Sequence, residues 1–260
     1  MQILRTIFKK EIVAEFLLPR QAQGKRRKTG RNKVIIIASG MPGVPRQRSL
    51  LEEFAKKGYW VFYPRYRGSW ESRGMFLKTS PEKDVRDVID SLPRGFKDLW
   101  SGKTYRVRPD ELYIFAGSFG GPAGILLSKD PRVAKVIAVS PVVDFRVSGP
   151  DEPLDKLEKY VTNGFAGGYR FRHKDWVRLG KGKFYNPATE LEKVDGRKIL
   201  IYHAQDDRIV RPKEVTAFAK KTAVKLKLLK KGGHLSMSML LKPRYWRQVK
   251  KFLGSNLKRI

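Results

Sequence analysis

The sequence predicts an α/β fold in which a doubly wound, mostly parallel sheet carries helices on both faces. Short, continuous apolar runs such as 33–38 have the length and β-branched content of strands buried on both sides. Segments with helical patterns alternate with these runs along the chain, as in βαβ units. With 260 residues and 41% hydrophobic content, the chain can bury a core, and we expect one domain over 1–260.

The N-terminal half starts with two expected strands, 2–8 and 11–18, and a polar loop over 21–32. The run 33–38 ends in the turn Ser39-Gly40-Met41-Pro42-Gly43, where glycine and proline break the strand. A helix over 50–57 and a strand over 59–63 follow. Ser80 as N-cap and Pro81 as the first helical residue predict the start of a helix that continues over 83–92.

The C-terminal half continues the alternation. Strands are expected over 112–115, 133–139, 198–202 and 224–229, and helices over 123–129, 212–221 and 244–253. Residues 146–190 break the pattern with charges, glycines and aromatic side chains. We expect this segment to be an insertion that forms a cap over the carboxyl ends of the strands, where sites form in such sheets.

One serine stands between the expected strand 112–115 and helix 123–129, within Gly117-Ser118-Phe119-Gly120-Gly121. A strand that turns into a helix within a few residues brings backbone segments so close that only small residues fit around the tip. At the helix N-terminus, backbone N–H groups stabilise developing negative charge. The pattern predicts a nucleophile elbow with Ser118 as nucleophile and Ala116 in place of the usual first glycine. The alternative is a solvated serine in a glycine-rich turn.

Two later strand ends carry the residues that a serine nucleophile needs. Asp206 and Asp207 follow strand 198–202, and His234 follows strand 224–229. A serine hydroxyl requires a base with a pKa of about 7 and a carboxylate that orients this base. The chain order Ser, Asp, His is that of α/β-hydrolases. We therefore predict Ser118, Asp207 and His234 as the catalytic residues.

Several assignments have alternatives. Asp206 and Asp144 are the other candidates for the acid; Asp144 follows the preceding strand, from which some hydrolases take this residue. We expect His203 to pack at the end of its strand and His173 to face solvent.

For the oxyanion hole we expect the backbone N–H groups of Phe119 and Met41. Each such donor is worth about 3 kcal/mol.

Four segments resemble the catalytic domain of the prolyl oligopeptidase family within the α/β-hydrolase superfamily: 63–69, 117–121, 140–144 and 203–210. The similarity runs from 34 to 252 without the insertion. It implies Asp207 as the acid and His234 as the base. The family's oligopeptidases usually add a β-propeller, for which this chain has no room, and their oxyanion loop often starts with His or Tyr, where this chain has Ser39. Propeller-free relatives include esterases that act on feruloyl or short acyl esters.

Composition restricts the chemistry further. The chain has no cysteine, which excludes disulfides, thiolate metal sites and a cysteine nucleophile, and with three histidines we expect neither metal nor cofactor. The net charge of +31 is spread along the chain and concentrated only at 25–28 and 242–259, and neither stretch interleaves aromatics in a nucleic-acid-binding pattern. We expect a basic surface that can hold polyanions non-specifically, and no specific nucleic-acid partner. No run is long enough for a transmembrane or signal segment, and we expect a cytoplasmic location.

The sequence thus predicts a serine hydrolase that acts through an acyl-enzyme. A carboxylesterase for short acyl or feruloyl-type esters is the favoured class, with Gly40 and Tyr66 contacting the substrate and 146–190 shaping the pocket. A serine peptidase that removes short or blocked N-terminal units is the alternative within catalysis. A basic protein that binds nucleic acid or anionic membrane on a hydrolase scaffold is the alternative outside catalysis.

Overall fold

The computed structural model describes residues 1–20 and 31–255. One sheet has the strand order β1-β2-β4-β3-β7-β8-β9-β10. The β1–β2 and β2–β4 pairs are antiparallel. All neighbouring pairs from β4 to β10 are parallel. The strand bounds are β1 (Leu4–Phe8), β2 (Ile12–Leu17), β3 (Lys33–Ala38), β4 (Trp60–Pro64), β7 (Glu111–Gly117), β8 (Val133–Val139), β9 (Ile199–Ala204) and β10 (Lys225–Leu229). The predicted doubly wound, mostly parallel sheet is confirmed.

Seven α-helices belong to the described residues. Their bounds are α1 (Arg48–Lys56), α2 (Glu82–Ser91), α3 (Gly121–Leu126), α4 (Leu154–Phe165), α5 (His173–Gly180), α6 (Pro212–Thr222) and α7 (Pro243–Leu253). Two short 3₁₀ turns matter for the site, η2 (Ser118–Gly120) and η7 (Met237–Leu241). None of the helices in residues 1–20 and 31–255 is both long enough and apolar enough to span a bilayer.

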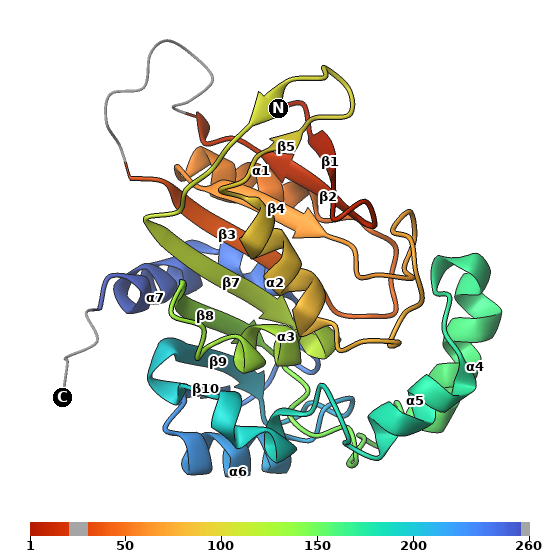
Figure 1. Cartoon of the computed structure of the whole chain (residues 1–260). Coiled ribbons are helices and arrows are strands. Elements are labelled where there is room, and N and C mark those ends of the chain that lie inside the picture. The colour runs from red at the N-terminus through yellow and green to blue at the C-terminus, as the bar shows by residue number, and fades with distance from the viewer. Residues whose placement is uncertain (21–30, 256–260) are drawn as a thin grey trace.

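The period of two along each strand divides the core between the two faces of the sheet. In β3, Val34 and Ile36 face the side that α2, α3 and α6 cover, whereas Ile35 and Ile37 face the side that α1 and α7 cover (Figure 1). Every one of these four side chains is fully buried. The continuous apolar runs of the sequence therefore reflect a sheet that is covered on both sides.

The helix expected after Ser80 differs in its first turn. It begins at Glu82 with Pro81 before it, and the Ser80 hydroxyl contacts the Glu82 carboxylate instead of a free backbone N–H. The predicted N-cap at Ser80 is therefore wrong, although the helix itself is present. A two-stranded hairpin, β5 (Phe96–Lys97) with β6 (Thr104–Tyr105), was not predicted.

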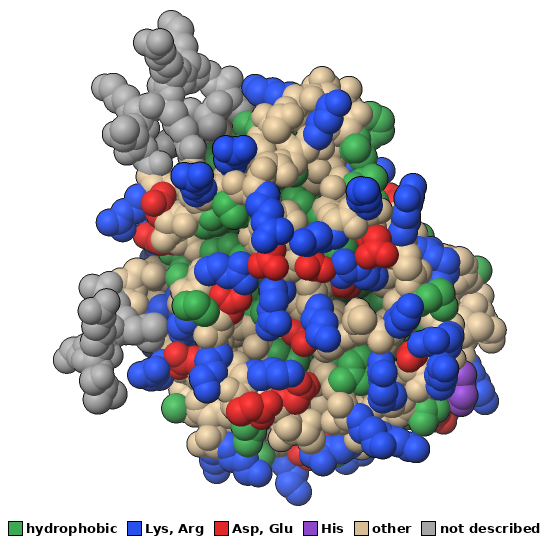
Figure 2. Space-filling view, viewed as in Figure 1, with side chains coloured by type: hydrophobic (Ala, Val, Ile, Leu, Met, Phe, Trp, Pro, Cys, Tyr) green, Lys and Arg blue, Asp and Glu red, His purple; other side chains and the backbone are tan. Residues whose placement is uncertain are grey.

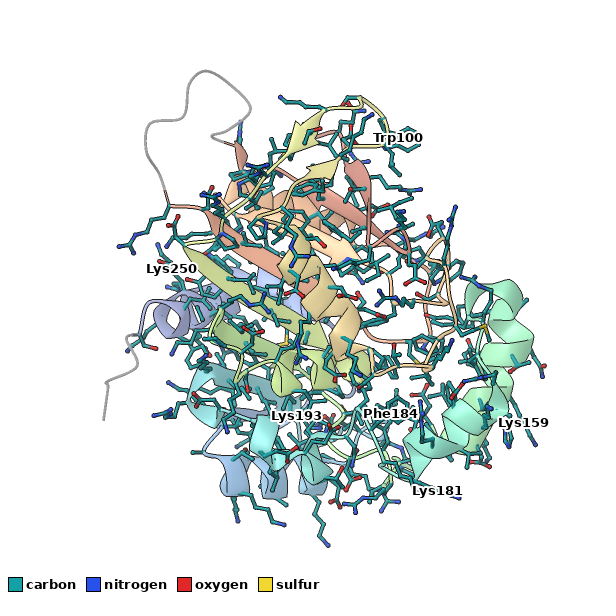
Figure 3. All side chains as sticks on the ribbon, viewed as in Figure 1. Trp100, Lys159, Lys181, Phe184, Lys193 and Lys250 are labelled. Atoms are coloured by element: carbon teal, nitrogen blue, oxygen red, sulfur yellow. The ribbon has the colours of Figure 1, made fainter. Side chains whose placement is uncertain are left out.

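Residues 146–190 contain two helices, α4 and α5, that the sequence did not predict. They lie beyond the carboxyl ends of the parallel strands (Figure 1). Their outer faces carry exposed basic residues, among them Lys159 and, just after α5, Lys181 (Figure 3).

Basic side chains cover the visible face of the molecule evenly, with acidic ones between them (Figure 2). The basic run 25–28 and residues 256–259 of the basic C-terminal segment lie outside the described residues. On the part that is described, the tip of the β5–β6 hairpin exposes Trp100, which is 65% accessible (Figure 3). No basic cluster dominates this face, as expected for a charge that is spread along the sequence.

Candidate active site

Ser118 stands at the tip of a crowded turn between β7 and α3. Its φ of +49° lies in the left-handed region, which a residue with a side chain rarely adopts. A Cβ on Gly120 would lie 2.2 Å from the carbonyl oxygen of Ala38, and one on Gly121 would lie 2.3 Å from Cβ of Pro141. These distances leave no space for a side chain at either glycine. The turn has the shape of a nucleophile elbow, with the serine raised above the end of the sheet.

His234 is held by Asp207. Its Nδ1 lies 2.9 Å from Oδ2 of the aspartate, and Oδ1 accepts hydrogen bonds of 3.0 Å from the backbone N–H groups of Ile209 and Val210. The carboxylate is thereby fixed from two sides. Because Nδ1 is engaged by Asp207, Nε2 is the imidazole nitrogen that remains for a hydroxyl.

The Asp207 side chain is completely buried, yet its surroundings favour the ionised form. Burial raises the pKa of the carboxyl, but the hydrogen bonds from His234 and from the Val210 N–H outweigh this effect, so the pKa lies below its usual range. A second imidazole lies behind it, with Nε2 of His203 3.6 Å from Asp207 Oδ2 and donating to the Val210 carbonyl at 3.0 Å. Burial lowers the pKa of His203, which favours its neutral form. His203 therefore packs at its strand end, as expected.

The two other carboxylates considered from the sequence have different partners. Asp206 accepts hydrogen bonds from the backbone N–H groups of Gly233 (2.9 Å) and Gly232 (3.2 Å), and these bonds lower its pKa. Asp144 is paired with Arg146, with 2.6 Å between Oδ2 and Nη2. Of the three, only Asp207 contacts His234, while Asp206 fixes the loop that carries it.

The His234 loop has a further anchor that the sequence analysis missed. The backbone N–H of Leu235 donates to Oγ of Ser140 at 3.0 Å. Ser140 follows β8 with a φ of +43°. The only sequence signal was its place directly before Pro141, which indicated the end of a strand but no contact. Ser140 and Asp206 thus hold the histidine loop at both sides of the imidazole.

The loop after β3 lies directly against the serine. A Cβ on Gly40 would be 2.9 Å from Cβ of Ser118. The hydroxyl of the buried Tyr66 donates to the Ser39 carbonyl at 3.0 Å. Gly40 and Tyr66, expected as substrate contacts, thus also shape the loop that carries Met41. Within residues 1–20 and 31–255, no backbone carbonyl accepts a hydrogen bond from the Met41 N–H.

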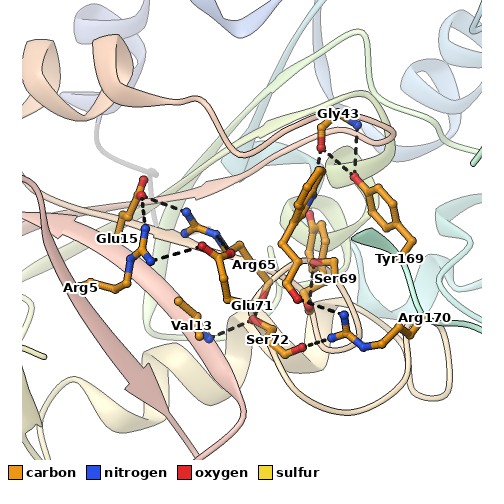
Figure 4. A network of polar contacts seen from close by, with 12 residues as sticks. Arg5, Val13, Glu15, Gly43, Arg65, Ser69, Glu71, Ser72, Tyr169 and Arg170 are labelled. Atoms are coloured by element: carbon orange, nitrogen blue, oxygen red, sulfur yellow. Dashed lines mark hydrogen bonds and ion pairs between the residues drawn. The ribbon is translucent and has the colours of Figure 1, made fainter. Parts of the chain in front are cut away.

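Two aromatic side chains fasten the same loop at Gly43. Nε1 of Trp70 donates to the Gly43 carbonyl at 3.0 Å, and the hydroxyl of Tyr169 lies 3.2 Å from both N and O of Gly43 (Figure 4). Tyr169 comes from the segment between α4 and α5. Sequence reasoning missed both anchors, because no local pattern relates position 43 to a position 126 residues away.

The 146–190 segment is fastened to the loop after β4. Tyr169 forms an isolated β-bridge with Ser69, and the flanking backbone bonds run from Trp70 N to Gly168 O (2.8 Å) and from Arg170 N to Gly68 O (2.7 Å). The Arg170 guanidinium also donates to the carbonyl of Trp70 at 3.0 Å (Figure 4). The segment is therefore positioned beside the serine. His173, at the start of α5, is exposed and contacts Glu158 at 2.9 Å.

A cavity of about 450 Å³ opens over Ser118 and His234. Gly40, Met41 and Tyr66 line it too, and α4 contributes two aromatic side chains, Tyr160 and Phe165. No hydrogen bond joins Ser118 to His234 in the described residues, but both line this one space. A narrower cavity of about 50 Å³ lies next to Ser118 and Phe119, and its lining is mostly apolar. The serine is thus flanked by a wide and a narrow space.

No protein-family model matches the sequence, and no curated protein matches it by sequence. Solved structures share its fold over nearly the whole chain. An esterase from Pyrococcus furiosus covers 97% of this chain and 89% of its own, with a TM-score of 0.65 and 16% identity. A soluble variant of monoglyceride lipase from Saccharomyces cerevisiae covers 97% and 96%, with a TM-score of 0.61 and 14% identity.

Acylaminoacyl peptidase from Pyrococcus horikoshii is similar over a part of its length. The alignment covers 97% of this chain and 40% of the peptidase, with a TM-score of 0.63 and 17% identity. Together with the sheet order, these similarities show that the chain has the α/β-hydrolase fold. They agree with the fold that the resemblance of the sequence motifs implied.

Proposed function

We propose that this protein is a serine hydrolase that acts through an acyl-enzyme, with Ser118 as nucleophile, His234 as base and Asp207 as the acid that orients it. The observation that carries the proposal is the 2.9 Å contact between His234 Nδ1 and Asp207 Oδ2, next to a serine in an elbow turn. The single domain over 1–260, with 146–190 as a cap inserted into it, belongs to the same proposal.

The reaction follows from the roles of these groups. Ser118 Oγ attacks the substrate carbonyl while its proton passes to His234 Nε2, and the imidazolium that forms is stabilised by the buried Asp207 carboxylate. The N–H groups of Phe119 and Met41 donate to the oxyanion of the tetrahedral intermediate. His234 then returns the proton to the leaving group. Water, deprotonated by the same imidazole, releases the acyl group and restores the serine.

We favour a carboxylesterase for short acyl or feruloyl-type esters. The narrow cavity of about 50 Å³ beside Ser118 and Phe119 suits a small acyl group, and the wide cavity has aromatic walls on which a ring can pack. A serine peptidase is the second candidate, since the wide cavity of about 450 Å³ also has room for a short peptide. A panel of acyl and feruloyl esters against aminoacyl and dipeptidyl amides separates the two, because robust amide turnover would overturn the preference.

Labelling with a fluorophosphonate tests the nucleophile. We expect mass spectrometry to find the adduct on Ser118, and Ser118→Ala to lose both the label and turnover of an activated short-chain ester, by about a millionfold if chemistry limits the rate. Ser236→Ala is the matched control, because Ser236 lines the same cavity but lies outside the elbow. A Ser118→Ala protein that keeps its activity, or an adduct on Ser236 instead, would refute the assignment.

A further inference from the structure

Among the residues that the structure describes, Glu152 supplies the one carboxylate in the lining of the cavity over Ser118. Glu152 lies two residues before α4 and is partly buried. Its neighbour Asp151 is paired with Arg208 at 2.7 Å, but no ion pair or side-chain hydrogen bond forms at Glu152 within residues 1–20 and 31–255. Partial burial of an ionised carboxylate without a partner costs folding free energy, and a bound ligand that supplies the partner would offset this cost.

The lining of the cavity contains few basic side chains, although the chain has a net charge of +31. Among the lysines and arginines in the described part of the chain, Arg65 alone lines this space. Its guanidinium is already in ion-pair contact with Glu15 (2.9 Å) and Glu71 (2.7 Å) on the side of β2 and the β4 loop (Figure 4). No lysine or arginine of the described lining is therefore free to pair with Glu152.

Aromatic side chains face the same space. Trp70, Tyr160, Phe165 and Tyr169 line the cavity and pack edge to face, with ring centroids 5.7 to 6.4 Å apart. Aromatic faces attract cations through the quadrupole of the ring. A cavity that combines several aromatic rings with one unpaired carboxylate has the chemistry of a site for an ammonium group.

Glu152 also lies close to the reacting atoms. It lines the narrow cavity beside Ser118 and Phe119 as well as the wide one, so it stands where the two spaces meet. Burial raises the pKa of Glu152, while the nearby imidazole of His234 acts in the opposite direction. An ammonium group held there would be only a few bonds from a carbonyl that Ser118 attacks.

We propose that Glu152 and the aromatic side chains that line the same cavity form a subsite for an ammonium group on the acyl part of the substrate, so that the favoured substrates are short α-aminoacyl esters with a free amine. This inference rests on the proposed hydrolase function and narrows its substrate class. Glu152 is then a specificity-determining residue, which contacts the substrate but takes no part in proton transfer.

The test compares two p-nitrophenyl esters of the same shape, alanyl and isobutyryl, at a pH where the amine is protonated. For Glu152→Gln we expect kcat/KM for the alanyl ester to fall by ten- to a hundredfold, and kcat/KM for the isobutyryl ester to stay within threefold. Asp151→Asn is the matched control, because it removes the same charge one residue away without touching the cavity. It should leave the ratio of the two esters unchanged.

A binding measurement provides a readout that needs no turnover. Calorimetry measures the affinity of the Ser118→Ala protein for the alanyl and the isobutyryl anilide. We expect the alanyl compound to bind at least tenfold more tightly, and this difference to disappear when Glu152→Gln is added. Equal losses for both esters in Glu152→Gln, or unchanged rates for both, would overturn the subsite. A cation preference in binding without turnover by the wild type would instead overturn the proposed hydrolase function and leave the subsite standing.

Discussion

A methyl group on Gly40 would lie 2.9 Å from Cβ of Ser118 and 3.3 Å from the carbonyl oxygen of Gly117. Side-chain carbons essentially never come within 2.9 Å of another atom, so the loop after β3 can pass this close to the elbow only because residue 40 has no side chain. Met41, the next residue, lines the same cavity as Ser118. The geometry of the proposed oxyanion hole thus depends on a residue that donates no hydrogen bond itself.

We expect Gly40→Ala to lower kcat for an activated short-chain ester by about ten- to a hundredfold, because the added methyl group moves the Met41 N–H away from the oxyanion. KM should change less, since the walls of the cavity stay in place. Gly43→Ala in the same loop is the control, as a Cβ there meets no atom within 4 Å. Steady-state kinetics of both variants test this prediction. If Gly40→Ala and Gly43→Ala changed kcat equally, the loop would tolerate a side chain at position 40.

Tyr169→Phe tests how firmly the oxyanion loop is held. The hydroxyl lies 3.2 Å from N and O of Gly43, and its removal leaves the loop with Trp70 as its remaining anchor at that residue. A mobile donor is worth less than a fixed one, so we expect kcat to fall by about five- to tenfold, within the range of a single oxyanion donor. Tyr160→Phe serves as control, because Tyr160 lines the same cavity but is 58% exposed. A similar loss in both variants would contradict a role of the Gly43 contact.

Replacing Asp207 should lower kcat far more than replacing the adjacent Asp206. Asp207→Asn removes the acceptor that fixes the His234 tautomer, and we expect kcat to fall by about ten-thousandfold. Asp206→Asn weakens hydrogen bonds to the Gly232 and Gly233 backbone only, and a loss of about tenfold or less is expected. Rates measured side by side with one activated ester test this order. If Asp206→Asn were the crippling change, the acid would be misassigned.

The shape of the elbow turn and the contact between Asp207 and His234 could be predicted, because crowding in one turn and the topology of the sheet determine them. Glycine at 120 and 121 follows from crowding within one strand–helix turn, and Asp207 and His234 each lie in the loop after a strand of the same sheet. Parallel strands end at one edge, so residues far apart in the sequence are brought together by the topology. Position after the strand alone does not separate Asp206 from Asp207; the resemblance favoured Asp207, and in the structure it is Asp207 that contacts His234.

Helices α4 and α5, the β5–β6 hairpin and the long-range anchors of the loop after β3 were not predicted, because no comparable sequence pattern marks them. Helix α4 buries only Leu157 and Val161, and this narrow apolar stripe is hidden among charged residues. The strands of the β5–β6 hairpin are two residues long, below the length at which alternation can be recognised. Long-range contacts such as that of Tyr169 with Gly43 are set by how the segment after α4 docks on the loop after β4, which no local pattern records.

Asp207 should also make the stability of the protein depend on pH. Hydrogen bonds from His234 and Val210 outweigh the effect of burial and hold the pKa of its carboxyl below the usual range. A carboxylate with a depressed pKa contributes stability that is complete above the pKa of the unfolded chain and is lost as the pH falls through the folded-state pKa. We therefore expect the free energy of unfolding, measured with urea between about pH 6 and about pH 3, to decline more steeply in the wild type than in Asp207→Asn. Parallel declines would mean that the folded protein does not stabilise the ionised carboxylate.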